Sequence, residues 1–299
     1  MNDDMRFGYF LNELTGEIVE VYEGDSVRII KDKHKNIIEN KKYIKKLDDN
    51  MKLYNDFYGG FVFSIFKYHN LILDNFKDIN ESDITRLFYI ATFVDYNGYL
   101  IFDGNKVVKN DLKLKIKLTK SYFYQFFMKM IKSGLLLEDD DNFIKVNRKY
   151  FYKGEIDKKL FKSYSFTRVY INTIRYLYEN INSNDCKYLG YLFKMIPYIH
   201  YETNILCWNP DCNYKDIDVI LTGDLPELLN SHNNTVKNMI NGLLKIKLKN
   251  KKTAITFIKN NVNDNKLPII INKEIFYAGK FDLPNGQKYI DKWFEVKEE

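Results

Sequence analysis

The spacing of apolar residues predicts a helix in the first half of this chain. From Ile84 to Val94, apolar side chains recur every three or four positions, as they do along the buried face of a helix. Ser82 can cap the start of this helix, and Asn97-Gly98 provides a turn beyond its end. We therefore expect a helix whose apolar face packs into a core.

Three more elements are predicted directly after this helix. A short strand is expected over residues 99–102, and a second helix over 108–116. Thr119 can cap a third helix that runs to Ser133, and Gly134 after it tolerates the positive φ at which helices often end. The broad apolar stripe of this third helix consists of Tyr122, Phe123, Phe126, Phe127, Met130 and Ile131.

A β-hairpin is predicted to complete the segment. Residues 135–137 and 143–146 have strand-forming side chains, and the polar stretch 138–142 lies between them as a turn. The resulting order is helix, strand, helix, turn, helix and hairpin. This order is typical of a winged helix-turn-helix domain, in which the hairpin is the wing.

The end of this segment occurs a second time in the chain. Residues 146–157 and 271–282 share the pattern aliphatic-Asn-basic-x-x-Phe-Tyr-x-Gly-x-x-Asp, and they lie 125 positions apart. Two copies of one pattern indicate a duplicated structural unit. Upstream of this pattern, three further residues match at a separation of 102 positions. Because that separation is shorter than 125, it predicts 23 additional residues within the second copy. The residues of that match are Leu87, Tyr89 and Tyr96 with Leu189, Tyr191 and Tyr198.

The second copy is expected to contain the same elements. Thr222 can cap a helix that ends near Leu229, and residues 231–234 form the turn after it. The lysine-rich stretch 245–252 leads into a β segment over 253–258, which would be the wing. The helix between the turn and the wing has a buried face formed by Val236, Met239, Ile240, Leu243 and Leu244.

The predicted fold class is α+β, with two tandem winged helix-turn-helix domains joined by a helical linker. The linker is inferred from apolar spacing over 166–181. A small N-terminal β-rich segment includes Ile18–Tyr22 and Ser26–Ile30, and the polar stretch 31–46 is an exposed connection or a solvated helix. Residues 61–66 form another strand or begin the first core. The expected boundaries are 1–60 for the N-terminal extension, 61–158 and 185–282 for the two winged-helix domains, 159–184 for the linker and 283–299 for a C-terminal tail.

The composition is that of a packed globular protein. Apolar residues make up 45% of the 299 positions, which is enough for a core in each module. No apolar run approaches the roughly 18–20 residues that span a bilayer, and the N-terminus lacks the basic-then-apolar order of a secretion signal. Three cysteines, an odd number, fit a reducing compartment. We therefore expect a cytoplasmic protein that does not use a membrane.

Positive charge is concentrated at equivalent places in the two copies. The net charge of the whole chain is +6. Residues 98–137 contain eight lysines and two aspartates, and residues 234–259 contain seven lysines and no acidic residue. A polyanion such as DNA would bind where this charge gathers.

A winged helix binds duplex DNA by laying its third helix in the major groove while basic residues of the wing contact phosphates. Gln125 or Asn238 could pair with adenine, and Lys120 or Lys129 could reach guanine or a phosphate. The alternative is a protein-protein module with solvated lysines. The residues expected to contact DNA are Lys109, Lys117, Lys120, Ser121, Tyr124, Gln125, Lys129, Lys145, Asn234, Thr235, Lys237, Asn238, Asn241, Lys249, Lys251 and Lys252.

Other chemistry has weaker support in the sequence. Cys207 and Cys212, with His200 and Cys186 nearby, suggest zinc, but the spacing lacks a second close pair. A DNA-nicking tyrosine would need a metal-holding histidine cluster, and the four histidines are isolated. Neither phosphate-binding glycine motif, G-x-x-x-x-G-K-[ST] or G-x-G-x-x-G, is present. We expect no enzymatic activity, catalytic residue, cofactor or bound metal.

One stretch of the chain resembles known DNA-binding proteins. With its segments LTKSYFYQFFMKMIKSGLL and IKVNRKYFYKG, the span from Asp83 to Gly154 resembles the winged-helix region of Firmicute plasmid replication initiators and, more loosely, MarR-like regulators. Two such domains joined by a helix also look like the architecture of iteron-binding plasmid initiators. The resemblance covers about a quarter of the chain.

The resemblance implies a sequence-specific duplex DNA-binding protein, foremost a plasmid or phage replication initiator that binds origin repeats. Its expected partners are double-stranded DNA, host replication proteins and a second copy in a homodimer. A transcriptional regulator that binds operator DNA is the first alternative. A winged-helix protein-protein interaction module is the second.

Overall fold

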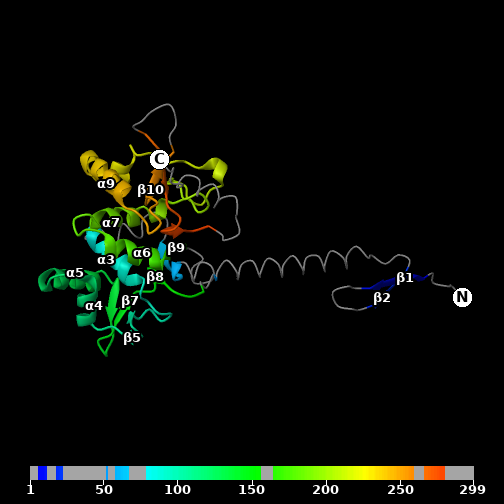
Figure 1. Cartoon of the computed structure of the whole chain (residues 1–299), viewed down its shortest axis with the longest axis horizontal. Coiled ribbons are helices and arrows are strands. Elements are labelled where there is room, and N and C mark those ends of the chain that lie inside the picture. Colours follow the sequence, from blue (N-terminus) through cyan, green and yellow to red (C-terminus); the bar gives the residue numbers. More distant parts are fainter. Residues whose placement is uncertain are drawn as a thin grey trace. The chain divides into compact units, whose positions relative to one another are not determined.

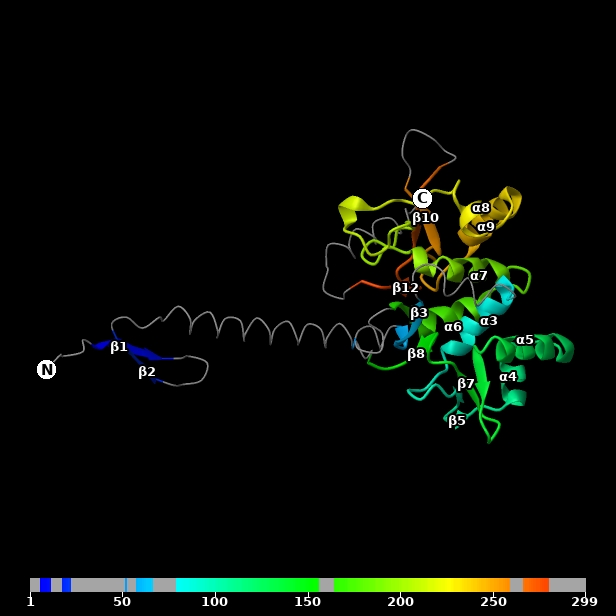
Figure 2. The same ribbon diagram turned by 180° about the vertical axis from the view of Figure 1, so that it is seen from behind.

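The computed structural model has a mixed α+β architecture (Figures 1 and 2). Two compact units divide the chain, Met1–Leu53 and Tyr54–Glu299. The residues that the structure describes are 6–11, 18–22, 52, 58–66, 79–155, 164–258 and 266–279.

The first unit contains one antiparallel pair of strands among its described residues. β1 (Arg6–Leu11) pairs with β2 (Ile18–Tyr22). The strand expected over 18–22 is therefore present, and it pairs with a strand over 6–11. The strand expected over 26–30 and the polar stretch 31–46 lie outside the described residues.

The second unit contains a four-stranded antiparallel sheet in the order β12-β9-β3-β8. β3 (Phe61–Phe66) and β9 (Ser165–Tyr170) pair along their whole length as the inner strands. β8 (Phe151–Tyr152) pairs with β3, and β12 (Phe276–Tyr277) pairs with β9. The two outer strands are the Phe-Tyr pairs of the repeated closing motif, so each copy of the motif adds one strand to the shared sheet.

The register of this sheet relates the two copies by an approximate two-fold axis. Phe63 of β3 lies opposite Arg168 of β9. On their outer sides, Phe63 pairs with Tyr152, and Arg168 pairs with Tyr277. Phe63 and Arg168 are 105 positions apart, and their partners Tyr152 and Tyr277 are 125 positions apart. Each central residue therefore pairs with the tyrosine of one copy of the closing motif. The axis therefore passes through the Phe63–Arg168 pair.

The first copy follows the predicted order of elements. α3 (Glu81–Ala91) begins after Asn80 instead of Ser82, because the Asn80 side-chain oxygen accepts a hydrogen bond from the backbone N–H of Asp83 at 2.9 Å. The remaining elements are β4 (Ile101–Phe102), β5 (Asn105–Lys106), α4 (Lys109–Ile116), α5 (Lys120–Lys132), β6 (Leu136–Glu138) and β7 (Ile144–Val146). The hairpin expected after the third helix is the β6–β7 pair.

The second copy contains the corresponding helices and hairpin. Its second helix begins after Asp224 instead of Thr222, and the Asp224 carboxylate accepts a hydrogen bond from the backbone N–H of Leu221 at 2.8 Å. The Thr222 hydroxyl accepts from the N–H of Leu267 at 3.2 Å. The elements after β9 are α6 (Ile171–Asn180), α7 (Cys186–Lys194), the 3-10 turns Ile196–Tyr198 and Tyr214–Asp216, α8 (Leu225–Leu228), α9 (Asn233–Lys245), β10 (Ile255–Phe257) and β11 (Ile269–Ile271).

The helical linker predicted over 159–184 is wrong at its start. Residues 165–170 form β9, a central strand of the sheet, and the helix α6 begins only at Ile171. Thr167 and Val169 are buried on this strand, and their β-branched side chains suit a pleated surface. The stretch predicted as a linker therefore contributes a strand and a helix to the fold.

The two first helices correspond at a separation of 105, and the match at 102 is wrong. Phe88 of α3 and Phe193 of α7 stack with their ring centroids 4.1 Å apart. Phe88 also meets Phe151 edge-on, and Phe193 meets Phe276 in the same way. Since Phe151 and Phe276 belong to the closing motifs, these contacts align the copies. The second copy accordingly has 20 additional residues in this span.

α3 and α7 pack closely against each other between the copies. The Thr85 hydroxyl donates to the carbonyl oxygen of Cys186 at 2.7 Å. Gly190, the counterpart of Thr85, faces the carbonyl of Glu81, the counterpart of Cys186, and a Cβ at Gly190 would overlap that carbonyl. The same contact thus occurs twice with different residues, and it requires a glycine on one side.

The closing motif has a structural role in both copies. The Asn147 side chain donates to the carbonyl of Gly134 at 2.7 Å and accepts from the N–H of Lys149 at 3.0 Å. Asn272 donates to the carbonyl of Thr253 at 3.0 Å and accepts from the N–H of Glu274 at 3.0 Å. The repeated asparagine therefore fastens the end of the hairpin to the turn that leads into the shared sheet.

Candidate nucleic-acid interface

Two helices that correspond at a separation of 113 lie on the same side of the second unit. In both views α5 and α9 flank the central pair α3 and α7 (Figures 1 and 2). Each follows a shorter helix and a turn with a left-handed residue, Lys117 at φ 55° before α5 and Asn230 at φ 47° before α9. A left-handed residue therefore stands three positions before the first residue of each helix.

α5 buries one face and exposes the other. Phe123, Phe126, Phe127 and Met130 are buried against the core. Tyr122 was expected within this stripe, yet 66% of its surface is exposed, because it lies about 90° around the helix from the centre of the buried face. The exposed residues are Lys120, Ser121, Tyr122, Tyr124, Gln125, Met128 and Lys132.

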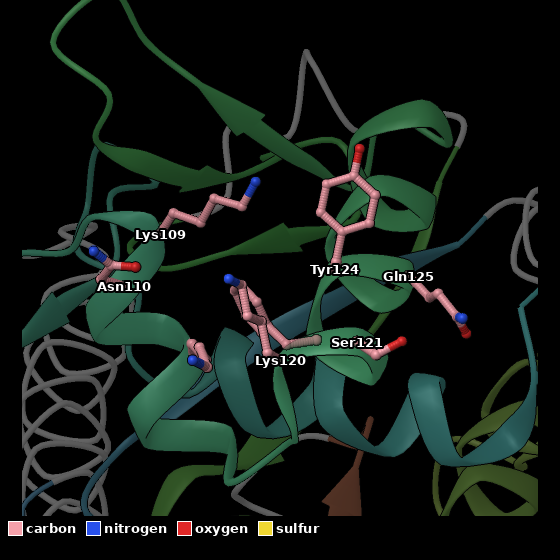
Figure 3. A pocket seen from close by; sticks show the side chains of 8 residues that line it. Lys109, Asn110, Lys120, Ser121, Tyr124 and Gln125 are labelled. Carbon is pink, nitrogen blue, oxygen red and sulfur yellow. The ribbon is translucent and has the colours of Figure 1, made fainter.

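An open hollow of about 610 Å³ lies between α4 and α5. It brings together five of the predicted site residues, and it also includes Asn110 and Lys113, which the sequence reasoning missed (Figure 3). In Figure 3, Lys109 extends from α4 towards Tyr124 of α5. The predicted residues in the hollow are Lys109, Lys120, Ser121, Tyr124 and Gln125.

α9 exposes a polar face at the corresponding positions. Val236, Met239 and Leu243 are buried, while the five predicted site residues are exposed. These exposed residues are Asn234, Thr235, Lys237, Asn238 and Asn241. Neither α5 nor α9 contains an acidic residue, so no carboxylate in either helix opposes an approaching phosphate.

A second hollow of about 720 Å³ continues from α9 towards the end of α6. Asn238 and Asn241 line it from α9, and Asn180 and Asn182 line it from the α6–α7 connection. Lys245 and Lys247 are also among its lining residues. The sequence reasoning missed Asn180, Asn182 and these two lysines as site residues, because only the fold brings the connection beside α9.

Four of the predicted lysines have partners within the protein, and one of them, Lys109, lies over the ring of Phe127, 4.5 Å from its centroid. Lys129 forms an ion pair with the buried Asp83 at 2.8 Å, and this carboxylate also pairs with Arg86 at 2.8 Å. Lys145 lies over the ring of Tyr99, 4.2 Å from its centroid. Lys252 approaches Glu274 at 3.4 Å. These lysines fasten elements of the fold, and Lys129 in particular joins α5 to α3.

The remaining predicted lysines lie at the ends of these segments. Lys117 is exposed at the end of α4, and Lys249 and Lys251 are exposed in the turn between Leu248 and Lys252. This turn is closed by a hydrogen bond from the N–H of Leu248 to the carbonyl of Lys252 at 2.8 Å. It precedes the stretch 253–258, where a wing was expected and where β10 lies.

His200 and Cys207, two of the zinc candidates in the sequence, are buried in the protein. His200 is buried, and one of its ring nitrogens lies 3.0 Å from the carbonyl oxygen of Cys212. Burial raises the pKa of Cys207 to about 12, so its thiol stays protonated at neutral pH. Over the described residues, no three His, Cys, Asp or Glu side chains gather in a group that could hold a metal ion.

Comparison with protein families, with curated proteins and with solved structures finds no match to this chain. The described part of the chain also has no helix with both the length and the apolar character needed to span a membrane. The function must therefore be inferred from the chain's own geometry and charge.

Proposed function

We propose that each copy is a winged helix-turn-helix domain and that the protein binds duplex DNA, with α5 and α9 as its two recognition helices. One observation carries the proposal: two corresponding helices on the same side of one unit expose basic, hydroxyl and amide side chains without any acidic residue. Recognition helices contact base edges with such side chains, and neighbouring lysines contact phosphates.

The α9 face fits base recognition most directly. Asn238 and Asn241 are one helical turn apart, and the carboxamide of Asn can pair bidentately with adenine in the major groove. Lys249 and Lys251 in the following turn can contact the phosphate backbone. Gln125 occupies in α5 the position of Asn238 in α9. It would give the DNA-binding surface of the first copy, called here the first head, one carboxamide.

We further propose that the biological role is replication initiation at a plasmid or phage origin, without enzymatic chemistry. Two heads held in one unit suit binding at adjacent segments of an origin. A transcriptional regulator that binds an operator remains the alternative role, since the same surfaces would serve it. Replication of a plasmid that lacks its own initiator, supported by this chain, separates the two roles.

Duplex binding is tested by fluorescence anisotropy with DNA from the region flanking the gene, at several salt concentrations. We expect the logarithm of the affinity to fall linearly with the logarithm of salt concentration, with a slope of about −0.9 for each phosphate contact. Affinity that does not depend on salt would contradict the proposal and would favour a protein-protein module.

The two heads are separated by footprinting with matched variants. The Lys120→Ala/Gln125→Ala double variant is expected to lose protection over one half of the site, and Lys237→Ala/Asn238→Ala over the other half. Both pairs are exposed, so folding should not change. Equal loss of protection over the whole site in both variants would argue against two independent heads.

A further inference from the structure

The two proposed recognition helices differ in one systematic respect. At three exposed positions α5 has large apolar or aromatic side chains, whereas α9 has polar ones. Tyr122, Tyr124 and Met128 are 66%, 57% and 44% exposed. Their counterparts 113 positions later are Thr235, Lys237 and Asn241. One copy has therefore kept a face for base edges, and the other presents aromatic rings to solvent.

The aromatic face of α5 lies within a strongly basic surface. Lys109, Lys113 and Lys120 line the hollow beside Tyr124 (Figure 3). The ammonium group of Lys109 is 5.3 Å from the ring centroid of Tyr124 and 4.5 Å from that of Phe127. A ring that stands next to several cations is suited to a ligand with both a flat aromatic part and a negative charge.

We propose that the hollow between α4 and α5 binds single-stranded DNA in addition to the duplex that α5 contacts in the proposed function. Tyr124 stacks on an unpaired base, and Lys109, Lys113 and Lys120 bind the phosphates of the strand. Gln125 and Asn110 provide amide groups for the base edges. The inference rests on the proposed function in one respect, namely that the same chain holds duplex DNA through α9.

An unpaired strand fits this surface better than a duplex does. The major groove presents donors, acceptors and the thymine methyl group, and its bases keep their flat faces stacked on one another. A tyrosine ring can stack only on a base whose face is free, and such stacking works for every base type. Lysines around the rings then supply sequence-independent affinity for the backbone.

The test compares single-stranded and duplex DNA with the full chain. Binding of a fluorescein-labelled thymidine 20-mer and of the footprinted duplex is measured by anisotropy at fixed salt. Tyr124→Ala should weaken binding of the single strand about fivefold or more, as expected for the loss of one stacked base, and change duplex affinity less than twofold. Tyr124→Phe keeps the ring and should retain affinity for the single strand.

Lys237→Ala is the matched control, because Lys237 occupies in α9 the position that Tyr124 occupies in α5. It should weaken duplex binding and leave binding of the single strand within twofold. If the chain binds the single strand but no duplex, the proposed function fails while this site stands. The opposite result, duplex binding without binding of the single strand, overturns this inference alone.

Two further outcomes would also overturn the inference. Equal losses for both DNA forms in Tyr124→Ala would make α5 an ordinary duplex-binding helix. A shift from dimer to monomer in sedimentation velocity for Tyr124→Ala/Met128→Ala, with unchanged DNA binding, would make this face an interface between two copies of the chain. Circular dichroism and thermal melting verify that each variant is folded.

Discussion

At the scale of single residues, the contact between the outer helix and the central helix differs between the two copies. Lys129 of α5 binds Asp83 of α3 at 2.8 Å. The counterparts of these residues in the second copy are Gly242 of α9 and Tyr188 of α7, and a Cβ at Gly242 would overlap the Tyr188 ring. An ion pair holds the exposed helix to its neighbour in one copy, and a ring packed on a glycine does so in the other.

Gly242→Ala should therefore destabilise the protein although alanine favours helices. The added methyl group displaces the Tyr188 ring, and overpacking of this kind costs about 1–3 kcal/mol, against a gain in helix propensity of about 1 kcal/mol. Urea denaturation measures the net loss. Asn241→Ala, at the exposed neighbour, is the control and should change stability by less than about 0.5 kcal/mol. Equal stability of the two variants would contradict the packing argument.

His200 should make stability depend on pH. Burial lowers the pKa of His200 in the folded protein. Its Nδ1 faces the backbone N–H groups of Glu202 and Thr203, both at 3.3 Å, so it acts as an acceptor and a proton there would meet two donors. In the unfolded chain the pKa is about 6.5, so the unfolded state takes up the proton first as the pH falls. The stability that the neutral His200 ring contributes is fully present above about pH 6.5, and it is lost as the pH falls below that value.

The measurement is urea denaturation at pH 7.5 and pH 5.5. Wild type and His232→Gln, a change at an exposed histidine, should lose stability over this interval by similar amounts. His200→Asn should be less stable at pH 7.5 and lose less on acidification. An unchanged pH dependence in His200→Asn would show that other groups cause it.

At the scale of elements, the crossing of α3 and α7 depends on the small residue at its closest point. Gly190→Ala would place a methyl group against the carbonyl of Glu81, which belongs to a helix backbone and cannot rotate away. We expect a loss of about 1–3 kcal/mol or more, measured by thermal and urea unfolding. Gly223→Ala is the control, since a Cβ there meets only the side chain of Lys266 at ordinary contact distance. A loss as large at Gly223 would contradict this account.

The elements with strong periodicity could be predicted from the sequence. The helices over 108–116 and 120–132 and the hairpin after them agree with α4, α5, β6 and β7. β9 could not be predicted, because its apolar residues continue without a break into the helix α6 and share its spacing. Only pairing with β3, a contact distant in sequence, makes this segment a strand.

The sequence predicts which helices carry the candidate site, but not which of their side chains are free to bind a ligand. The helix positions of Ser121, Gln125, Asn234 and Asn238 follow from periodicity alone. The ion pair of Lys129 was not visible in the sequence, because its partner Asp83 lies 46 positions earlier in another helix. Aligning α5 with α9 position by position would have identified Tyr122 as exposed, since its counterpart is the polar Thr235.

At the scale of the whole molecule, the shared sheet and the α3–α7 contact join the two copies into one unit. β3 and β9 pair over six residues, and Phe88 and Phe193 stack between the copies. The core residues of both copies form one continuous cluster. The heads α5 and α9 are therefore held by a common core, and neither can move far without disturbing it.

This arrangement predicts that the second unit unfolds in one step. Urea denaturation followed by far-UV circular dichroism and by tryptophan fluorescence should give the same midpoint. Separate fragments covering 54–160 and 161–299 should fail to fold alone, because each would expose the inner edge of its central strand. Two resolved transitions, or an independently folded fragment, would contradict the single core.

The axis through Phe63 and Arg168 has a consequence for the history of the chain. In a symmetric homodimer, a residue on the axis meets its own copy, so any substitution there changes both sides of the contact at once. Here the two partners are an aromatic ring and a cation, a combination that no pair of identical subunits could present. Covalent linkage of the two halves avoids that constraint, and each half can carry different residues, as the tyrosines of one outer helix and the asparagines of the other illustrate.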